Sequence, residues 1–336
     1  MWNKQFLRER TGGMRQVAAI RRMVLDDDKG RGMRVWNFDN GGGLAFAVYP
    51  DRGLDIGEAS YKGVPLVWLT ANGPVAPAFY DASGINWLRS WGGGMLTGCG
   101  LQNVGGPNSA GGEEHGLHGR LSHTPAGEVN SRCFWNDKGE YVLEASGVIR
   151  MSRVFGENLA ISRRISTVAG SSAVTIEDAV ENQGFAAQPL MQLYHMNFGW
   201  PLVDDGCVLE TPEHRVTPQN DIAAAGLAAW DRITAPIPGF VEQVFYHDIP
   251  AGNDGMAAIR LRNPKLKLAL EVAYRTAELP YLVQWKQMGQ GEYVLGLEPA
   301  NCYPEGQSAI AQKGLLRTIA PGETVNTKIQ VSLSTL

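Results

Sequence analysis

The chain has 336 residues, of which 19% are charged, and its formal net charge is −4 at pH 7. This balance lacks the basic field that binding to nucleic acid or to an anionic membrane needs, and it favours a small polar or weakly anionic ligand. The charged N-terminus is no signal peptide and no run of about 18 apolar residues occurs, so we expect a cytoplasmic protein without a membrane span.

The first third of the chain alternates between short strand-like segments and glycine-rich turns. Residues 1–30 are expected to form an N-terminal cover segment, with one or two strands or a short helix over a sheet. Strand-like alternation begins in residues 34–38 and continues in 43–50, followed by the motif DRGLDI at 51–56. Residues 85–120 are rich in glycine and lack a period, and a loop of that length is usually functional.

The remainder is dominated by period-2 patterns that predict strands. They cover residues 141–155, 158–170, 173–184, 190–199, 241–249, 256–262, 266–275, 281–288, 293–300 and 325–333. Residues 204–240 look irregular, with a short helix expected at 222–230. Because patterns of helical period are nearly absent and no composition shift marks a boundary, we predict an all-β chain: one large antiparallel β-sandwich domain over residues 1–336.

Glu298 is the most informative residue, because it is a single acid inside the apolar run VLGLEPANCYP. A carboxylate in such a run is costly to bury unless it is paired, hydrogen-bonded or retained for chemistry. A buried ion pair with arginine or lysine is the structural alternative. Asn301 is a candidate hydrogen-bond partner for this carboxylate.

Two histidines lie in comparable apolar settings. His195, in QLYHMNFG, is either a core histidine bonded to a carbonyl or a general acid near neutral pH, and Asn197 beside it is a candidate substrate contact. His118, in GLHGR, is flanked by glycines that allow a ligand to approach the backbone. The neighbouring His115 gives an HxxH spacing, but the glycines break a helix and HEXXH is absent, so we expect no metal.

Further candidate substrate contacts come from two regions. Trp285 and Lys286 are expected to lie across a hairpin from Glu298, where an indole could stack on a sugar and an amine could bind hydroxyls or an acid. The glycine-rich first third adds Arg52, Arg89, Gln102 and Asn103. The structural alternatives are a core position for Trp285 and pairing of Arg52 with Asp51 or Asp55.

Three motifs in order, LHG at 117–119, YHMNFG at 194–199 and GLEPANCYP at 296–304, resemble the aldose 1-epimerase (galactose mutarotase-like) superfamily, and specifically its DUF4432-type branch. The resemblance implies a β-supersandwich and interconversion of the α and β anomers of a free reducing sugar. It also implies His195 as general acid, Glu298 as general base and His118 as a substrate-binding residue. The chain departs from better-known mutarotases by LHGR in place of LHGG and by lacking a secure counterpart of their substrate-binding aspartate.

The implied reaction moves only protons, so no cofactor is expected, and the expected partner is a small sugar, neutral or acidic. Three alternatives remain open at this stage: a non-catalytic sugar-binding or sensing protein, a carbohydrate lyase or hydrolase, and an epimerase acting at another carbon. A hydrolase normally needs two carboxylates, and only one is evident. We expect a monomer or a homodimer.

Overall fold

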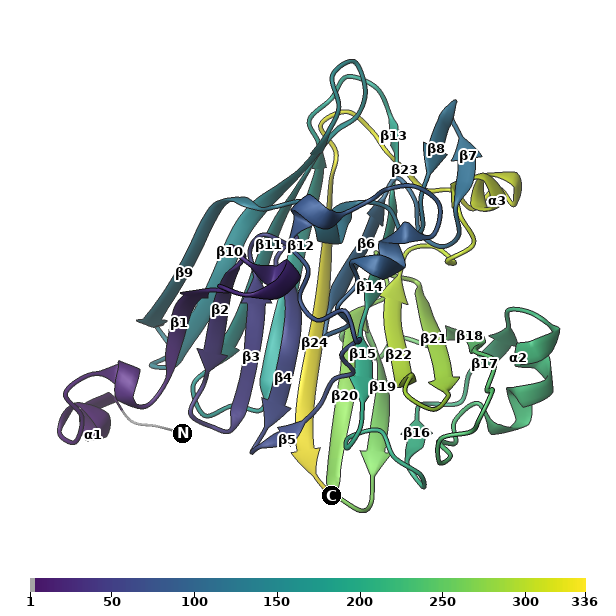
Figure 1. Cartoon of the computed structure of the whole chain (residues 1–336). Helices are drawn as coiled ribbons and strands as arrows, with labels where there is room; N and C mark the ends of the chain where they lie inside the picture. The colour runs from purple at the N-terminus through teal and green to yellow at the C-terminus, as the bar shows by residue number, and fades with distance from the viewer. Residues whose placement is uncertain (1–3) are drawn as a thin grey trace.

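The computed structural model describes residues 4–336, and β-strands dominate it (Figure 1). An N-terminal sheet of five strands runs in the order β1 (Ala19–Val24), β2 (Arg34–Asp39), β3 (Leu44–Tyr49), β4 (Asp55–Tyr61) and β5 (Val64–Pro65). An eight-stranded sheet has the order β16 (Val208–Glu210), β19 (Met256–Asn263), β20 (Leu268–Arg275), β24 (Thr324–Thr335), β12 (Ala173–Asn182), β11 (Asn158–Val168), β10 (Tyr141–Ser152) and β9 (Gly127–Trp135).

A seven-stranded sheet carries the motifs of His195 and Glu298. Its order is β17 (Arg215–Pro218), β18 (Gln243–Asp248), β21 (Tyr281–Met288), β22 (Tyr293–Ala300), β14 (Met191–His195) and β6 (Thr97–Leu101), with β15 (Asn197–Gly199) also paired to β22. Two small ladders join β7 (Asn108–Ala110) to β8 (Glu113–His115) and β13 (Gln188–Pro189) to β23 (Thr318–Ile319).

The helices are short and peripheral. The α-helices are α1 (Lys4–Arg8), α2 (Asp221–Gly226) and α3 (Gln307–Gln312), and short 3-10 turns include η4 (Asn86–Arg89), η5 (Leu121–His123) and η6 (Leu227–Ala229). Within residues 4–336 no helix has the length and apolar character that a membrane crossing would require.

The predicted all-β antiparallel architecture is confirmed, and most predicted strands agree with the observed ones within a few residues. The helix expected at 222–230 is present as α2 and η6. The segment 190–199 is one predicted strand but two observed ones, interrupted at Met196. Of the expected cover segment, residues 1–3 lie outside the described residues; the rest forms α1 and β1, and β1 is an edge strand of the N-terminal sheet.

One apolar core fills the space between the sheets. Alternation along β12 buries every second residue, as expected for a strand with one face on the core. Phe38 and Phe46 of the N-terminal sheet stack with ring centroids 4.6 Å apart and belong to the same core as Ile161 of β11 and Leu295 of β22. In Figure 1 the N-terminal sheet lies in front of the teal strands β9–β12, and the green strands of the seven-stranded sheet lie beside it.

A charged network lies inside this apolar core. Arg163 of β11 binds both carboxylate oxygens of Asp178 of β12, at 2.9 and 2.7 Å, and the two side chains are fully shielded from solvent. The same guanidinium donates to the Gly53 carbonyl in DRGLDI at 2.9 Å. From the seven-stranded sheet, the Tyr194 hydroxyl donates to Asp178 at 2.6 Å. The network therefore links the N-terminal sheet and both large sheets.

Replacing Asp178 by asparagine is expected to destabilise the protein by about 3–5 kcal/mol, because the Arg163 charge would stay buried without its bidentate partner. The measurement is the urea midpoint of unfolding. Glu177→Gln is the matched control, because Glu177 precedes Asp178 and points to the outer face. Its ion pair with Arg164 is half exposed, so this substitution should lower the free energy of unfolding by less than about 1 kcal/mol. Equal losses for the two variants would contradict a structural role of the network.

Candidate active site

The candidate site lies on the face of the seven-stranded sheet that points away from the main core. On β14, Tyr194 points into that core, so its neighbour His195 points to the opposite face. Leu193 pairs with Ala300, and Asn197 pairs with Gly296, so the register places His195 directly opposite Glu298 of β22. We call this the site face.

His195 and Glu298 are in contact. His195 Nδ1 lies 3.1 Å from Glu298 Oε1, and the residues are only 5% and 2% exposed. The two atoms are at hydrogen-bond distance but are not aligned for a hydrogen bond, so neither has such a partner within the described part of the chain. Asn197 Oδ1 is a third unpartnered buried atom on the site face. Buried polar atoms left unpaired are costly, so these three atoms are candidates to bind a polar ligand.

Tryptophans and a histidine surround His195. The ring centroids of Trp91, Trp285 and His118 lie 5.0, 5.4 and 5.6 Å from that of His195. Trp68 packs edge-on against Trp91 and Trp285. Trp68, Trp91 and His118 come from the segment between β5 and η5, which contains the whole predicted functional loop at 85–120. Except for β6, which belongs to the sheet, this segment packs over the site face.

Local backbone geometry orients His118. The residue has a φ of +57°, and Gly119 follows with +72°, so the chain turns sharply at this point. The His118 backbone bonds to Gly105 O and Gly100 N, each at 3.0 Å. Because its Nδ1 accepts from the Gly105 N–H, the neutral ring carries its proton on Nε2, which is free to donate to a ligand oxygen.

Burial shifts the titration of all three groups toward their uncharged forms. The pKa of His195 is well below its ordinary value, first because of burial and then because of the nearby His118. The pKa of Glu298 is well above its ordinary value, first because of burial and then because of the charge of Glu242. Burial also lowers the pKa of His118, to about 4. In the ligand-free site, neutral imidazoles beside a protonated carboxyl are therefore favoured.

Gly296 makes room for the carboxyl group. A Cβ atom at this position would lie 2.4 Å from Glu298 Oε1 and 2.9 Å from Trp285 Cβ, both far inside normal contact. The Glu298 side chain therefore lies back along its own strand, over residue 296, in a space that only glycine leaves open.

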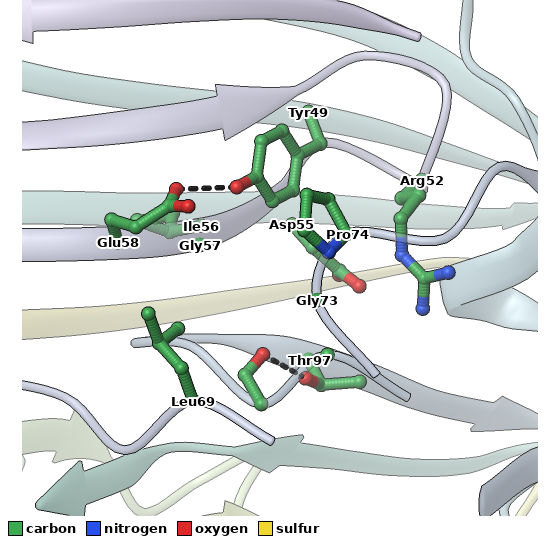
Figure 2. A pocket seen from close by; sticks show the side chains of 12 residues that line it. Tyr49, Arg52, Asp55, Ile56, Gly57, Glu58, Leu69, Gly73, Pro74 and Thr97 are labelled. Carbon is green, nitrogen blue, oxygen red and sulfur yellow. Dashed lines mark hydrogen bonds between the residues drawn. The ribbon is translucent and has the colours of Figure 1, made fainter. Parts of the chain in front are cut away.

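Arg52 has structural contacts rather than a place in this site. Its guanidinium donates to the carbonyls of Val75 and Ser90 at 2.8 and 3.0 Å and lies 3.2 Å from His123 Nε2. Figure 2 shows Arg52 and Asp55 lining a separate pocket beside the hydrogen-bonded pair of Tyr49 and Glu58. Its volume of about 40 Å³ is far below that of a sugar-binding pocket.

Three more residues predicted to contact substrate have the following surroundings in the structure. Asn103 is fully buried and bonds to Gly116 O, Asn108 and the Gln307 N–H, so it holds loops together. Arg89 is exposed on η4 and donates to Asn86. Gln102 lines a small pocket with Glu113, Glu114 and His115, and its Nε2 has no partner among the described residues.

Lys286 lies on the opposite face of β21 from Trp285. Its ammonium donates to the carbonyls of Ala229 and Arg232 at 2.7 and 2.6 Å, and burial lowers its pKa to about 8. The predicted hairpin is confirmed, since Val283 and Trp285 pair with Glu298 and Gly296, but alternation sends Lys286 inward.

Asn301 does not bind the Glu298 carboxylate. Its amide instead accepts from the Gln192 N–H at 2.7 Å and donates to Leu190 O at 2.9 Å, joining β14 to the end of β22.

Within residues 4–336 no group of three or more His, Cys, Asp or Glu side chains is arranged to hold a metal ion. His115 and His118 diverge, because His115 is on the hairpin β7–β8 and His118 points to the site face.

Sequence reasoning missed Trp68, Trp87 and Glu242. Trp87 packs against Trp91 and His118 and its indole nitrogen has no partner among the described residues. Glu242 accepts a hydrogen bond from Trp285 Nε1 at 2.7 Å. The clustering of tryptophans in NWLRSW signalled an aromatic cluster, whereas nothing local distinguished Glu242 from a solvated acid.

Known structures share this fold. A Klebsiella pneumoniae subsp. pneumoniae protein described as a "putative aldose 1-epimerase" matches with a TM-score of 0.88 and 24% identity, over 95% of this chain and 86% of that one. A galactose mutarotase-like protein from Clostridium acetobutylicum gives 0.65 and 14%, over 96% and 100%. Galactose 1-epimerase from Lactobacillus acidophilus NCFM gives 0.59 and 12%, over 95% and 99%. At these identities the likeness establishes the galactose mutarotase-like fold.

Comparison with curated proteins gave no match. The model of one protein family, described as "Domain of unknown function (DUF4432)", matches residues 30–333, which is nearly the whole chain. The match includes all three motifs of the site and the DRGLDI segment. The protein thus belongs to the DUF4432 family and has a galactose mutarotase-like fold.

Proposed function

We propose that the protein is a sugar mutarotase, which interconverts the α and β anomers of a free reducing sugar by opening and closing the ring. The observation that carries the proposal is the contact of His195 with Glu298, across β14 and β22, within a wall of tryptophans. An acid and a base on one face can serve the two oxygens bonded to the anomeric carbon. The fold shared with aldose 1-epimerase-like proteins supports this reading.

The reaction can be balanced with one mobile proton on the pair. The Glu298 carboxylate removes the proton from the anomeric hydroxyl while the His195 imidazolium protonates the ring oxygen. The bond from C1 to the ring oxygen breaks as the C1 carbonyl forms. The open-chain aldehyde rotates about C1–C2 and closes on its other face by the reverse transfers, so no electrons are gained or lost.

The protonation state explains how a buried pair can start this reaction. Burial favours neutral His195 and protonated Glu298, which is the state of the pair after ring opening. The reactive state, with imidazolium and carboxylate, holds the same number of protons and differs only in which group carries the shared one. Hydroxyls of a bound sugar would stabilise the charged form by hydrogen bonding.

The wall around the pair suits a neutral sugar. Trp285 is only partly buried and offers an indole surface for the apolar face of a pyranose. Arg52 and Lys286 are bound to carbonyls, Arg89 is exposed, and no lysine or arginine of the described chain is among the groups that shift the pKa of Glu298. A sugar anion would lack a counter-ion there and would meet the charge of Glu242. We therefore favour a neutral aldose over the acidic sugar left open by the sequence.

Replacing Glu298 by glutamine is expected to reduce catalysed anomer exchange by about 10²-fold or more, because the amide cannot accept the proton. Exchange is measured by NMR on freshly dissolved α-anomers of D-galactose, D-glucose and D-xylose. Binding of the same sugars should persist, since glutamine keeps the shape and one acceptor. Glu292→Gln, at the exposed turn of the same hairpin, should retain the wild-type rate. Unchanged exchange in the Glu298 variant would remove the proposed base.

The catalysed rate should follow a bell-shaped pH profile, because the pair must hold one proton. At pH values below the plateau, His195 takes up a second proton for the pair. Because the pKa of His195 is lowered, the acid limb of the profile lies below 6.5, the ordinary pKa of histidine. Above the plateau Glu298 loses the last proton, and since its pKa is raised this limb lies well above the ordinary 4.5. Rates are corrected for buffer-catalysed exchange. A single limb centred at 6.5 would show that burial does not control the pair.

Substrate charge provides a separate check. Neutral aldoses should be accelerated at least about tenfold more, in kcat/KM, than uronates or aldose 6-phosphates of the same configuration, because desolvating an unpaired anion is costly. The comparison uses matched pairs such as D-glucose and D-glucuronate. Preference for the anion would show that a cation reaches the site in the complex.

A further inference from the structure

Glu242 lies at the edge of the site and is bonded to its wall. It precedes β18, where Val244 pairs with Trp285 of β21. Glu242 is two residues before Val244, so it lies diagonally across the strand pair from Trp285. Its Oε2 accepts a hydrogen bond from Trp285 Nε1 at 2.7 Å. The Glu242 side chain is exposed and the Trp285 side chain is partly buried, so this bond is at the boundary between solvent and site.

Trp285 in turn contacts His195 and lies two residue pairs along the β21–β22 ladder from Glu298. Its ring meets that of His195 edge-on at 5.4 Å, and it also packs against Trp91 at 5.8 Å. On β22 its partner is Gly296, the residue over which the Glu298 carboxyl lies. Rotation of the indole would therefore change its packing against His195 and Trp91, and the bond from Glu242 opposes such a rotation.

Titratable groups approach Glu298 from several elements. His195 on β14 is in contact with it, and His118 lies behind His195. Cys99 on β6 is close enough for Glu298 to affect its titration. Glu242 is the charged group whose field acts on Glu298 itself. A single negative charge at the rim thus faces a pair whose reaction requires a carboxylate and an imidazolium.

We propose that Glu242 is a positioning residue of this site, which fixes the Trp285 indole against the acid–base pair and sets the electrostatic environment in which Glu298 exchanges its proton. The role of Glu242 in catalysis rests on the proposed function. The effects of Glu242 on the Trp285 indole and on the titration of Glu298 do not depend on that function. Two substitutions separate the two effects. Glu242→Gln keeps a carbonyl oxygen for the indole N–H and removes the charge, whereas Glu242→Ala removes both.

In Glu242→Gln the titration of Glu298 should move to lower pH by roughly half a unit to one unit, because the repelling charge is gone. The readout is the ¹³C carboxyl resonance of Glu298 in protein labelled at glutamate, assigned with Glu298→Gln. The Trp285 indole ¹H–¹⁵N resonance should stay close to its wild-type position. In Glu242→Ala the titration of Glu298 should move to lower pH as in Glu242→Gln. The Trp285 indole resonance should move upfield, because its hydrogen bond is lost.

Activity gives the second readout. Glu242→Gln should keep the plateau rate of anomer exchange within about twofold and move the alkaline limb to lower pH. Glu242→Ala should also lose about tenfold or more in kcat, because a displaced indole misplaces the reacting groups. Glu292→Gln, which removes an exposed acid from the turn of the β21–β22 hairpin, is the control and should change neither resonance nor limb.

An unchanged Glu298 titration in Glu242→Gln, or an unchanged indole resonance in Glu242→Ala, would overturn the proposal. If the wild-type protein accelerates no anomer exchange with the three test sugars, the proposed function fails, but the two NMR titrations still decide the role of Glu242. Folding of each variant is verified by its urea midpoint, which should match that of Glu292→Gln.

Discussion

The buried ion pair of Arg163 and Asp178 is the constraint on which the rest of the structure depends. It is shielded from solvent between the sheets, so it is stable only while every partner stays in place. One of those partners is the Tyr194 hydroxyl, and another is the Gly53 carbonyl of DRGLDI. Because Tyr194 is fixed inward, strand alternation sends His195 outward, to the face covered by the tryptophan-bearing loop. A polar network within the core thus determines where the imidazole points.

The site itself results from a second constraint, the pairing of β14 and β15 with β22. This register puts an imidazole and a carboxyl directly opposite each other in a setting that disfavours charge on both. Two such groups hold one proton between them and can exchange it with a ligand that offers a donor and an acceptor. His195 and Glu298 are nearly shielded from solvent, which strengthens the electrostatic interaction between them. In the proposed function, the pair and the tryptophan wall act together in proton transfer.

The strands could be predicted from sequence because they depend on local patterns, whereas the histidine–glutamate pair was implied by the family resemblance. Period-2 alternation identified β10, β12 and β22, and the three motifs implied the association of His118, His195 and Glu298. The contacts of Arg52 and Lys286 could not be predicted, because each depends on which carbonyls a distant segment brings to the side chain. β6 was missed inside the glycine-rich loop, since its residues Thr97–Leu101 have too few side chains to show alternation.

Gly296 limits how this site can change. The carboxyl of Glu298 lies where the side chain of residue 296 would be, so the row of side chains along β22 has a gap at that position. Even a methyl group there would force the acid toward His195 or out of the plane of its strand. A larger residue at position 296 is therefore incompatible with the present position of the Glu298 carboxyl.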